Sequence, residues 1–231
     1  DFRPSGALEI RKAGYEFDKM RKRIKRHLKQ RSEMLSGISH DLRTPLTRIK
    51  LQLALINNKK IATELSEDVD EMEKMLNEYL QFAKTGAEEK TEIFDLSELL
   101  RNLIKRYNSG NILLKYSKKI NFEGRKELMK RCINNLIENS TKYGDKIHID
   151  LNKLRQNLII TIEDNGPGIP KNEYENVFKP FYKIDKSRSV TKSSVGLGMS
   201  ISSDIIRSHG GTIKLGKSKM GGLKVTISLP S

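Results

Sequence analysis

Apolar side chains recur mostly every three or four residues between positions 24 and 56, which is the spacing of one face of an α-helix. A polar stretch at 57–60 then predicts a turn, and a second series with the same spacing follows it. The sequence therefore predicts two helices joined as a hairpin. The apolar positions are Ile24, Leu28, Leu35, Ile38, Leu42, Leu46, Ile49, Leu53 and Ile56 in the first series, and Ile61, Leu65, Val69, Met72, Leu76, Tyr79 and Ala83 in the second.

The two apolar series have the spacing of coiled-coil seams. One hairpin cannot cover both of its own stripes, whereas two hairpins can do so by packing into a four-helix bundle. We therefore expect the chain to form a homodimer through these helices.

From Glu92 onward, strand-like and helix-like runs alternate, with glycines at the junctions. The polar segment 85–91 before them predicts a linker, and Asp95 and Glu98 stand where the cap and third residue of a helix are expected. Helices together with a mostly antiparallel sheet predict a two-layer α/β sandwich. The expected helices are 95–107, 125–143, 173–178 and 198–209, and the expected strands are 112–117, 146–154, 158–163, 212–215 and 223–229, with a turn at 155–157 between the second strand and the third.

Composition narrows the possible classes of protein. The 231 residues carry a formal net charge of +15, and this charge is spread along the whole chain rather than gathered with aromatic residues. Neither a basic-aromatic patch nor zinc-finger spacing is present, so no nucleic-acid partner is expected.

No stretch reaches the ~20 apolar residues of a membrane-spanning helix, which predicts a soluble polypeptide. The single cysteine, Cys132, excludes an internal disulfide and fits a small core residue.

The first candidate for chemistry is His40. It lies two positions from both Ile38 and Leu42, and two residues turn a helix by about 200°, so its ring is predicted to point away from the apolar seam. An exposed imidazole is a nucleophile when one ring nitrogen is unprotonated. A lone helical histidine is more often a plain surface residue, but Asp41 could accept the other ring N–H, and Thr44 follows one helical turn later.

Three further clusters lie in the second half. Asn135 and Asn139 share a helix face with Lys142 nearby, and asparagine oxygens suit Mg²⁺ while lysine suits phosphate. Asp164 follows a strand directly and precedes a Gly-Pro-Gly turn, where it could accept a hydrogen bond from a buried ligand. The segment 196–198 precedes a helix, and its glycines would let backbone N–H groups approach a phosphate. Taken singly, these clusters also fit a polar helix face, a plain loop and a hinge.

In this order and spacing, the four clusters resemble the H, N, G1 and G2 boxes of bacterial sensor histidine kinases, and residues 178–182 (FKPFY) resemble their F box. Residues 39–51 (SHDLRTPLTRIKL) are most similar to osmosensor kinases of the EnvZ type. Residues 6–20 resemble the second helix of a HAMP signalling domain.

The resemblance implies three parts: a HAMP-like helix end at 1–30, a dimerising phosphotransfer hairpin at 31–88, and an ATP-binding sandwich at 89–231. The sandwich would be of the GHKL, or Bergerat, type shared with gyrase and Hsp90. ATP and Mg²⁺ would be the cofactors. The protein would be membrane-attached through a preceding N-terminal region, with this segment cytoplasmic, and its partners would be a second copy and the receiver domain of an OmpR-like response regulator.

The resemblance also implies the role of each site residue. His40 would accept the phosphoryl group, with Asp41 as its acid/base partner and Thr44 supporting dephosphorylation of the regulator. Asn139 would bind Mg²⁺. The other residues placed around the nucleotide are Asn135, Lys142, Tyr143, Asp164 for the adenine amino group, Gly166 and Gly168 for the turn beside it, Phe181 of the F box, and Gly196, Leu197 and Gly198 for the phosphates.

The chain departs from the family pattern at three positions. Ser194 stands where a first glycine is usual in the phosphate loop, Ser140 replaces the usual alanine after Asn139, and Lys183 replaces an arginine that often closes the F box. Ser194 leaves open a phosphatase-dominant or non-catalytic nucleotide-binding module. A hydrolytic ATPase of the same superfamily is a further alternative, but those enzymes carry a glutamate base where this chain has Asn135.

Overall fold

The computed structural model describes residues 8–56, 58–83, 89–107, 111–116, 118–184 and 196–230. Within the first two helices, the side chains of residues 25, 28–29, 31–33, 35–36, 39–40 and 78–83 lie outside this description. The chain divides by its internal contacts into two units, 1–87 and 88–231. Each unit is described by itself below.

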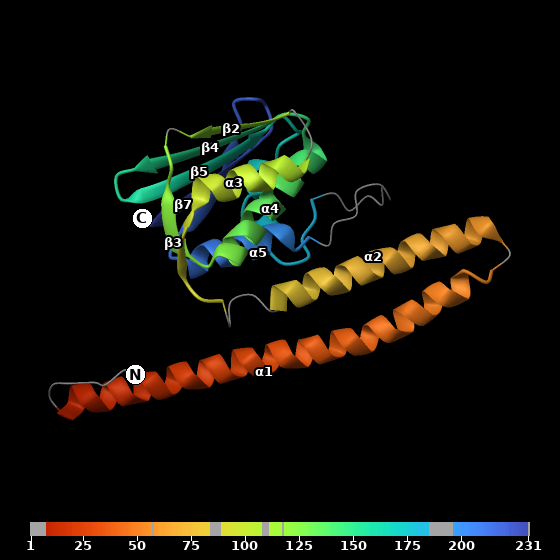
Figure 1. Ribbon diagram of the computed structural model, residues 1–231, viewed down its shortest axis with the longest axis horizontal. Helices are drawn as coiled ribbons and strands as arrows, with labels where there is room; N and C mark the ends of the chain where they lie inside the picture. The colour runs from red at the N-terminus through yellow and green to blue at the C-terminus, as the bar shows by residue number, and fades with distance from the viewer. Residues whose placement is uncertain are drawn as a thin grey trace. The chain divides into compact units, whose positions relative to one another are not determined.

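The first unit is the predicted helical hairpin, formed by α1 (Leu8–Leu53) and α2 (Lys59–Ala83) (Figure 1). Helix α1 continues through Pro45. It ends earlier than the sequence indicated, because the bonds that follow tighten to three-residue spacing, from the Leu55 N–H to the Gln52 carbonyl and from the Ile56 N–H to the Leu53 carbonyl. Asn58 then starts α2, since its Oδ1 accepts a hydrogen bond from the Ile61 N–H at 3.3 Å.

Polar contacts join the two helices of the hairpin. Lys50 Nζ lies 2.6 Å from Asp70 and 2.5 Å from Glu73, and these hydrogen bonds raise the pKa of the Lys50 ammonium. Leu53 and Val69 are buried. Much of the apolar seam is exposed in the single chain, at Ile38, Leu42, Ile49, Ile61, Leu65 and Met72. A second copy of the hairpin could cover these positions, as the pattern predicted.

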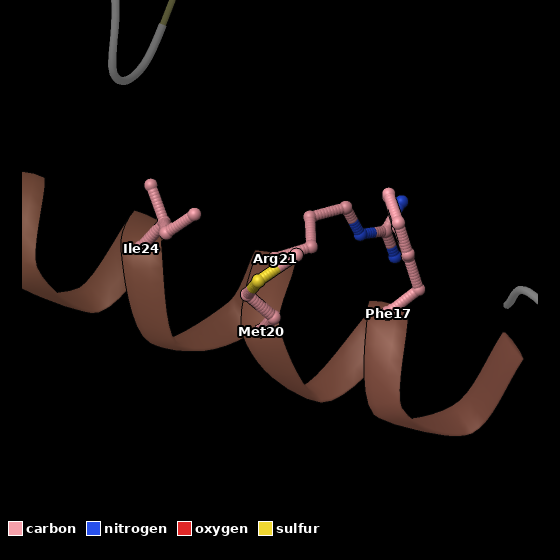
Figure 2. Close-up of a pocket in the computed structure, with 4 residues that line it drawn as sticks. All are labelled: Phe17, Met20, Arg21 and Ile24. Atoms are coloured by element: carbon pink, nitrogen blue, oxygen red, sulfur yellow. The ribbon is translucent and has the colours of Figure 1, made fainter. Parts of the chain in front are cut away.

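The N-terminal half of α1 also presents apolar side chains. Phe17, Met20 and Ile24 line a shallow depression together with Arg21 (Figure 2). In the part of the chain that the structure describes, no helix combines the length and the apolar character needed to cross a membrane.

The second unit is built on a five-stranded sheet with the strand order β2-β4-β5-β7-β6. Strands β2 and β4 are parallel, and the other neighbours are antiparallel. A small antiparallel pair, β1 with β3, lies in a separate sheet. The strands are β1 (Glu92–Asp95), β2 (Ile112–Tyr116), β3 (Asn121–Gly124), β4 (Ile147–Leu154), β5 (Asn157–Asp164), β6 (Thr212–Lys217) and β7 (Leu223–Pro230).

Helices α3 (Leu96–Ile104), α4 (Lys126–Tyr143) and α5 (Gly198–Ser208) gather on one side of this sheet (Figure 1). Alternate residues of the strands are buried, which is the pattern of a sheet with one face against a core. The arrangement confirms the predicted two-layer α/β sandwich. Cys132 of α4 is fully buried, and burial raises the pKa of its thiol to about 12, as fits a core residue.

The structure corrects several local predictions. The expected helix at 173–178 is instead two 3-10 turns, η2 (Lys171–Glu173) and η3 (Asn176–Phe178), because the backbone bonds there span three residues, from the Glu173 N–H to the Pro170 carbonyl and from the Lys179 N–H to the Asn176 carbonyl. The turn between β4 and β5 contains only residues 155–156, and residue 157 already pairs in β5. Strands β1 and β3 were not predicted. A further 3-10 turn, η1 (Lys105–Tyr107), ends the helix expected at 95–107.

Two helices of this unit begin at carboxylate caps. Asp95 accepts hydrogen bonds from the backbone N–H groups of Ser97 and Glu98, which confirms it as the N-cap of α3. The start of α4 is capped from outside the helix, since the Glu89 carboxylate accepts from the Glu127 N–H at 2.6 Å and the Leu128 N–H at 3.1 Å. The helix that carries Asn135 and Asn139 is therefore anchored by the segment that enters the unit.

Candidate active site

Asp164, at the end of β5, is the most constrained polar side chain of the candidate site. It is only 4% exposed. Its Oδ1 atom accepts hydrogen bonds from the backbone N–H groups of Gly166 and Leu223, each at 3.0 Å. Its Oδ2 atom accepts a longer hydrogen bond, at 3.4 Å, from the hydroxyl of Ser140. The backbone thus fixes one carboxylate oxygen, and the other keeps lone pairs with which it could accept from a ligand.

The glycines around Asp164 allow the backbone to approach its carboxylate. A Cβ on Gly222 would lie 2.2 Å from Asp164 Oδ1, and a Cβ on Gly166 would lie 2.7 Å from the Tyr143 carbonyl oxygen. Gly168 has a φ of +71°, a conformation that L side chains rarely adopt. The Gly-Pro-Gly turn, the end of α4 and the start of β7 therefore meet around one buried carboxylate.

Asn135 and Asn139 face the beginning of α5. A Cβ on Gly198 would lie 3.8 Å from Asn135 Cβ and 3.9 Å from Asn139 Nδ2. The Asn135 Nδ2 atom is buried and has no hydrogen-bond partner among the described residues. A buried amide without a partner calls for an explanation, and a bound polar ligand would supply one.

The first turn of α5 offers backbone donors next to these asparagines. Leu197 occupies the N-cap position and is fully buried, and its side chain makes no cap hydrogen bond. The first N–H groups of a helix have no partner within the helix and bind anions readily. Gly196 has a φ of +79°, and a Cβ there would lie 2.8 Å from the Tyr182 carbonyl oxygen, so this position requires glycine.

The other predicted nucleotide residues lie in the same unit. Lys142 Nζ lies 5.4 Å from the centroid of the Tyr143 ring at the end of α4. Phe181 is exposed and has a φ of +65°, and its N–H donates to the Gly196 carbonyl at 3.0 Å. The structure thus brings Asn135, Asn139 and Gly198 together, and α4 connects this group to Asp164 through Ser140.

The predicted phosphotransfer residues lie on α1, in the other unit. Asp41 and Thr44 are exposed on this helix. The backbone of His40 is helical, but its side chain lies outside the described residues, so the predicted outward orientation of the ring stays a prediction. Ser194 also lies outside the described part of the chain.

Sequence reasoning missed two contributions to this site. Ser140 was noted only as a departure from the family pattern, and its bond to Asp164 Oδ2 gives it a structural role. The Leu223 amide could not be found from the sequence, because 59 residues separate it from its acceptor. The Gly221-Gly222 pair before it was the one local signal of a close backbone approach.

Each of the two units contains a region that matches a known protein family. Residues 30–88 match the His Kinase A (phospho-acceptor) domain, and residues 124–231 match the family of histidine kinase-, DNA gyrase B- and HSP90-like ATPases. This chain belongs to the sensor histidine kinases. The more specific likeness of residues 39–51 to EnvZ-type kinases stays a prediction.

Two curated relatives match nearly the whole of this histidine kinase chain. It is 33% identical over 227 residues to the sensor histidine kinase GtrS of Pseudomonas aeruginosa, which covers 97% of this chain and 47% of the relative. It is 27% identical over 240 residues to the sensor histidine kinase CpxA of Escherichia coli, which covers 98% of this chain and 52% of the relative. The chain thus spans about half the length of the curated relatives it matches.

A solved structure of full-length ShkA in complex with AMPPNP shares the fold of this chain over the part that matches. The TM-score is 0.69 with 22% identity, over 86% of this chain and 45% of that one. At this identity the comparison supports the fold alone.

Proposed function

We propose that this histidine kinase uses ATP to phosphorylate His40 and then passes the phosphoryl group to an aspartate of a response regulator. The observation that carries the proposal is the group formed by Asn135, Asn139 and the first turn of α5, on a helix whose Ser140 bonds to the buried carboxylate of Asp164. It occurs in a chain whose residues 30–88, which include His40, match a phospho-acceptor domain.

The catalytic unit supplies complementary groups for the two ends of ATP. Asp164 Oδ2 accepts from the adenine amino group, while Gly166 and Gly168 shape the wall beside it. The N–H groups at Gly196, Leu197 and Gly198 bind phosphate oxygens, as the start of a helix does in other nucleotide sites. Asn135, Lys142, Tyr143 and Phe181 complete the surroundings of the nucleotide.

The donor set fits a nucleotide-bound Mg²⁺ and does not fit a metal cage made by the protein alone. The described residues contain no group of three or more His, Cys, Asp or Glu side chains that could hold a metal ion. Mg²⁺ is commonly bound through one or two protein oxygens together with phosphates and water, and the Asn139 amide oxygen would supply one such ligand. The ion would neutralise charge that develops on the phosphates during transfer.

The transfer itself requires an unprotonated ring nitrogen on His40. This nitrogen attacks the γ-phosphorus in line, the bond to the β-γ bridging oxygen breaks, and ADP leaves with that oxygen. Asp41 stabilises the proton on the second ring nitrogen. In the next step a carboxylate oxygen of the regulator attacks the phosphorus, and the bond from phosphorus to His40 breaks.

The proposal also covers the partners of the whole protein. A second copy covers the exposed seam of the hairpin, and the apolar depression at Phe17, Met20 and Ile24 extends the same helix face toward the N-terminus. The regulator would be OmpR-like, Thr44 would support dephosphorylation of that regulator, and a preceding region would attach the protein to the membrane. These assignments rest on the family resemblance.

A phosphorylation assay tests the central claim. The chain is incubated with γ-labelled Mg-ATP, and His40→Gln is compared with His27→Gln, a matched change at an exposed histidine on the same helix. We expect an acid-labile label on the wild type and on H27Q, and a loss of at least a hundredfold for H40Q. An H40Q variant that keeps the full label would refute the assignment.

The alternatives give different results in the same assay. A phosphatase-dominant module, favoured by Ser194 in the sequence, would dephosphorylate the regulator through Thr44 without labelling His40. A hydrolytic ATPase would release phosphate steadily in both H40Q and the wild type.

A further inference from the structure

A polar network beside the two 3-10 turns is not used by the nucleotide site described so far. The Glu173 Oε2 atom accepts hydrogen bonds from the Tyr182 hydroxyl at 2.5 Å and from Asn176 Nδ2 at 3.0 Å. Lys179 Nζ donates in turn to Asn176 Oδ1 at 2.7 Å. One carboxylate therefore holds the first residue of the η3 turn and a residue beyond its end.

The ionisation of the network agrees with this geometry. The hydrogen bond from Tyr182 lowers the pKa of the Glu173 carboxyl, and the same bond raises the pKa of the Tyr182 phenol. Near neutral pH the pair is thus an ionised acceptor and a neutral donor, which is a stronger combination than two neutral groups.

Tyr182 is connected through the backbone to the start of α5. The Phe181 N–H donates to the Gly196 carbonyl, and the Tyr182 carbonyl lies so close to Gly196 that no Cβ would fit between them. Phe181 has a positive φ of 65°, which is uncommon for a residue other than glycine and persists only where the surroundings enforce it. The hydrogen bond that holds the next side chain, Tyr182, is one such enforcing contact.

Gly196 is followed directly by the residues whose backbone N–H groups are proposed to bind phosphate. After Gly196 comes the buried Leu197, and then Gly198, which lies against Asn135 and Asn139. A shift of Tyr182 would move Gly196, and a shift of Gly196 would move the first N–H groups of α5 relative to Asn139.

We propose that Glu173 is a positioning residue for the nucleotide phosphates, which holds the Gly196–Gly198 amides in place through its hydrogen bond to Tyr182. The inference rests on the proposed function and deepens it, because it assigns the geometry of the phosphate subsite to a residue that does not touch the nucleotide. It predicts a specific defect, in which affinity for the phosphates falls while affinity for the nucleoside is kept.

The test compares nucleotide binding to the whole chain in Glu173→Gln and Tyr182→Phe. Dissociation constants for ATP, ADP and adenosine are measured by competition with a fluorescent nucleotide. Hydrogen bonds to charged groups are worth enough that we expect both variants to bind ATP and ADP about tenfold more weakly. Adenosine, which has no phosphate, should bind within about twofold of the wild type. E173Q removes the charge from this hydrogen bond and Y182F removes the bond, so the double variant should resemble Y182F alone.

Glu175→Gln is the matched control, since Glu175 is an exposed glutamate two residues away whose side chain makes no cap hydrogen bond to the η3 turn. It should bind all three ligands like the wild type. Unchanged ATP affinity in both E173Q and Y182F would overturn the inference, and so would equal losses for ATP and adenosine. A wild-type chain that does not bind ATP would remove the proposed function as well, which separates the two failures.

Discussion

At the scale of single residues, the site depends on glycines around the buried carboxylate of Asp164. The backbone approaches this carboxylate so closely there that a side chain would not fit. Gly222 is the clearest case. A Cβ there would lie 2.2 Å from Asp164 Oδ1 and 2.5 Å from the Gly166 N atom, two groups that are hydrogen-bonded to each other. To admit a Cβ, the bonded pair would have to shift together or separate, so even a methyl group would change the site.

We therefore expect Gly222→Ala to abolish measurable ATP binding and to destabilise the catalytic unit by about 1–3 kcal/mol, the usual range for overpacking. Thermal unfolding with and without ATP measures both effects. Gly216→Ala provides a control in β6, the strand that pairs with β7 after Gly222, because a Cβ at Gly216 meets no atom within 4 Å. The explanation fails if G222A retains the wild-type shift of the unfolding transition by ATP.

At the scale of elements, His209 joins the end of α5 to the start of α4. The Arg125 N–H donates to His209 Nε2 at 3.0 Å, and His209 Nδ1 lies 2.8 Å from the Ile205 carbonyl oxygen. Since a carbonyl only accepts, the proton is on Nδ1 and the ring is neutral. Burial lowers the pKa of His209, helped by the positive charge of Arg125 and opposed by its hydrogen bond to Ile205 and by the carboxylate of Glu89.

This lowered pKa makes stability depend on pH. Between the folded pKa of His209 and the ordinary histidine value of about 6.5, the unfolded state binds more protons than the folded state. The neutral ring therefore makes its full contribution to the free energy of unfolding above pH ~6.5. This contribution is lost as the pH falls from about 6.5 to the lowered pKa of the folded state. We expect the wild type to lose more stability than His209→Gln between pH 7.5 and pH 5.5, as measured by urea unfolding. Identical losses would show that the ring does not titrate in this way.

At the scale of the whole molecule, the first unit leaves an apolar seam that its own two helices do not cover. Leu65 and Met72 of α2 are exposed in the single chain, as are Leu42 and Ile49 of α1. Their coiled-coil spacing matches what a four-helix bundle of two hairpins would bury.

The dimer is tested by placing a charge in this seam. Because a buried leucine is worth about 1.5–3 kcal/mol, Leu65→Glu should weaken dimerisation at least tenfold, with light scattering across a dilution series as the measurement. Thr63→Glu adds the same charge at an exposed polar position of α2 and should leave the dimer intact. A monomeric wild type, or an L65E chain that stays dimeric at the lowest concentrations, would contradict this interpretation.

Features that depend on neighbours along the chain could be predicted from the amino-acid pattern. The period of the apolar residues gave the hairpin and the long helix α4, and Asp95 was identified as a cap because capping involves residues two and three positions away. The order of the motifs indicated the family. Each of these signals is local, or is a simple succession of local signals.

Contacts between groups that are distant along the chain became known from the folded structure. The parallel pairing of β2 with β4, the Glu89 cap on α4, the Leu223 amide on Asp164 and the bond from Tyr182 to Glu173 all join segments that the sequence pattern leaves independent. Strands β1 and β3 are four residues each, too short to show a period, and they form because they pair with each other. Long-range contacts are settled by packing of the whole unit, and so a local pattern cannot specify them.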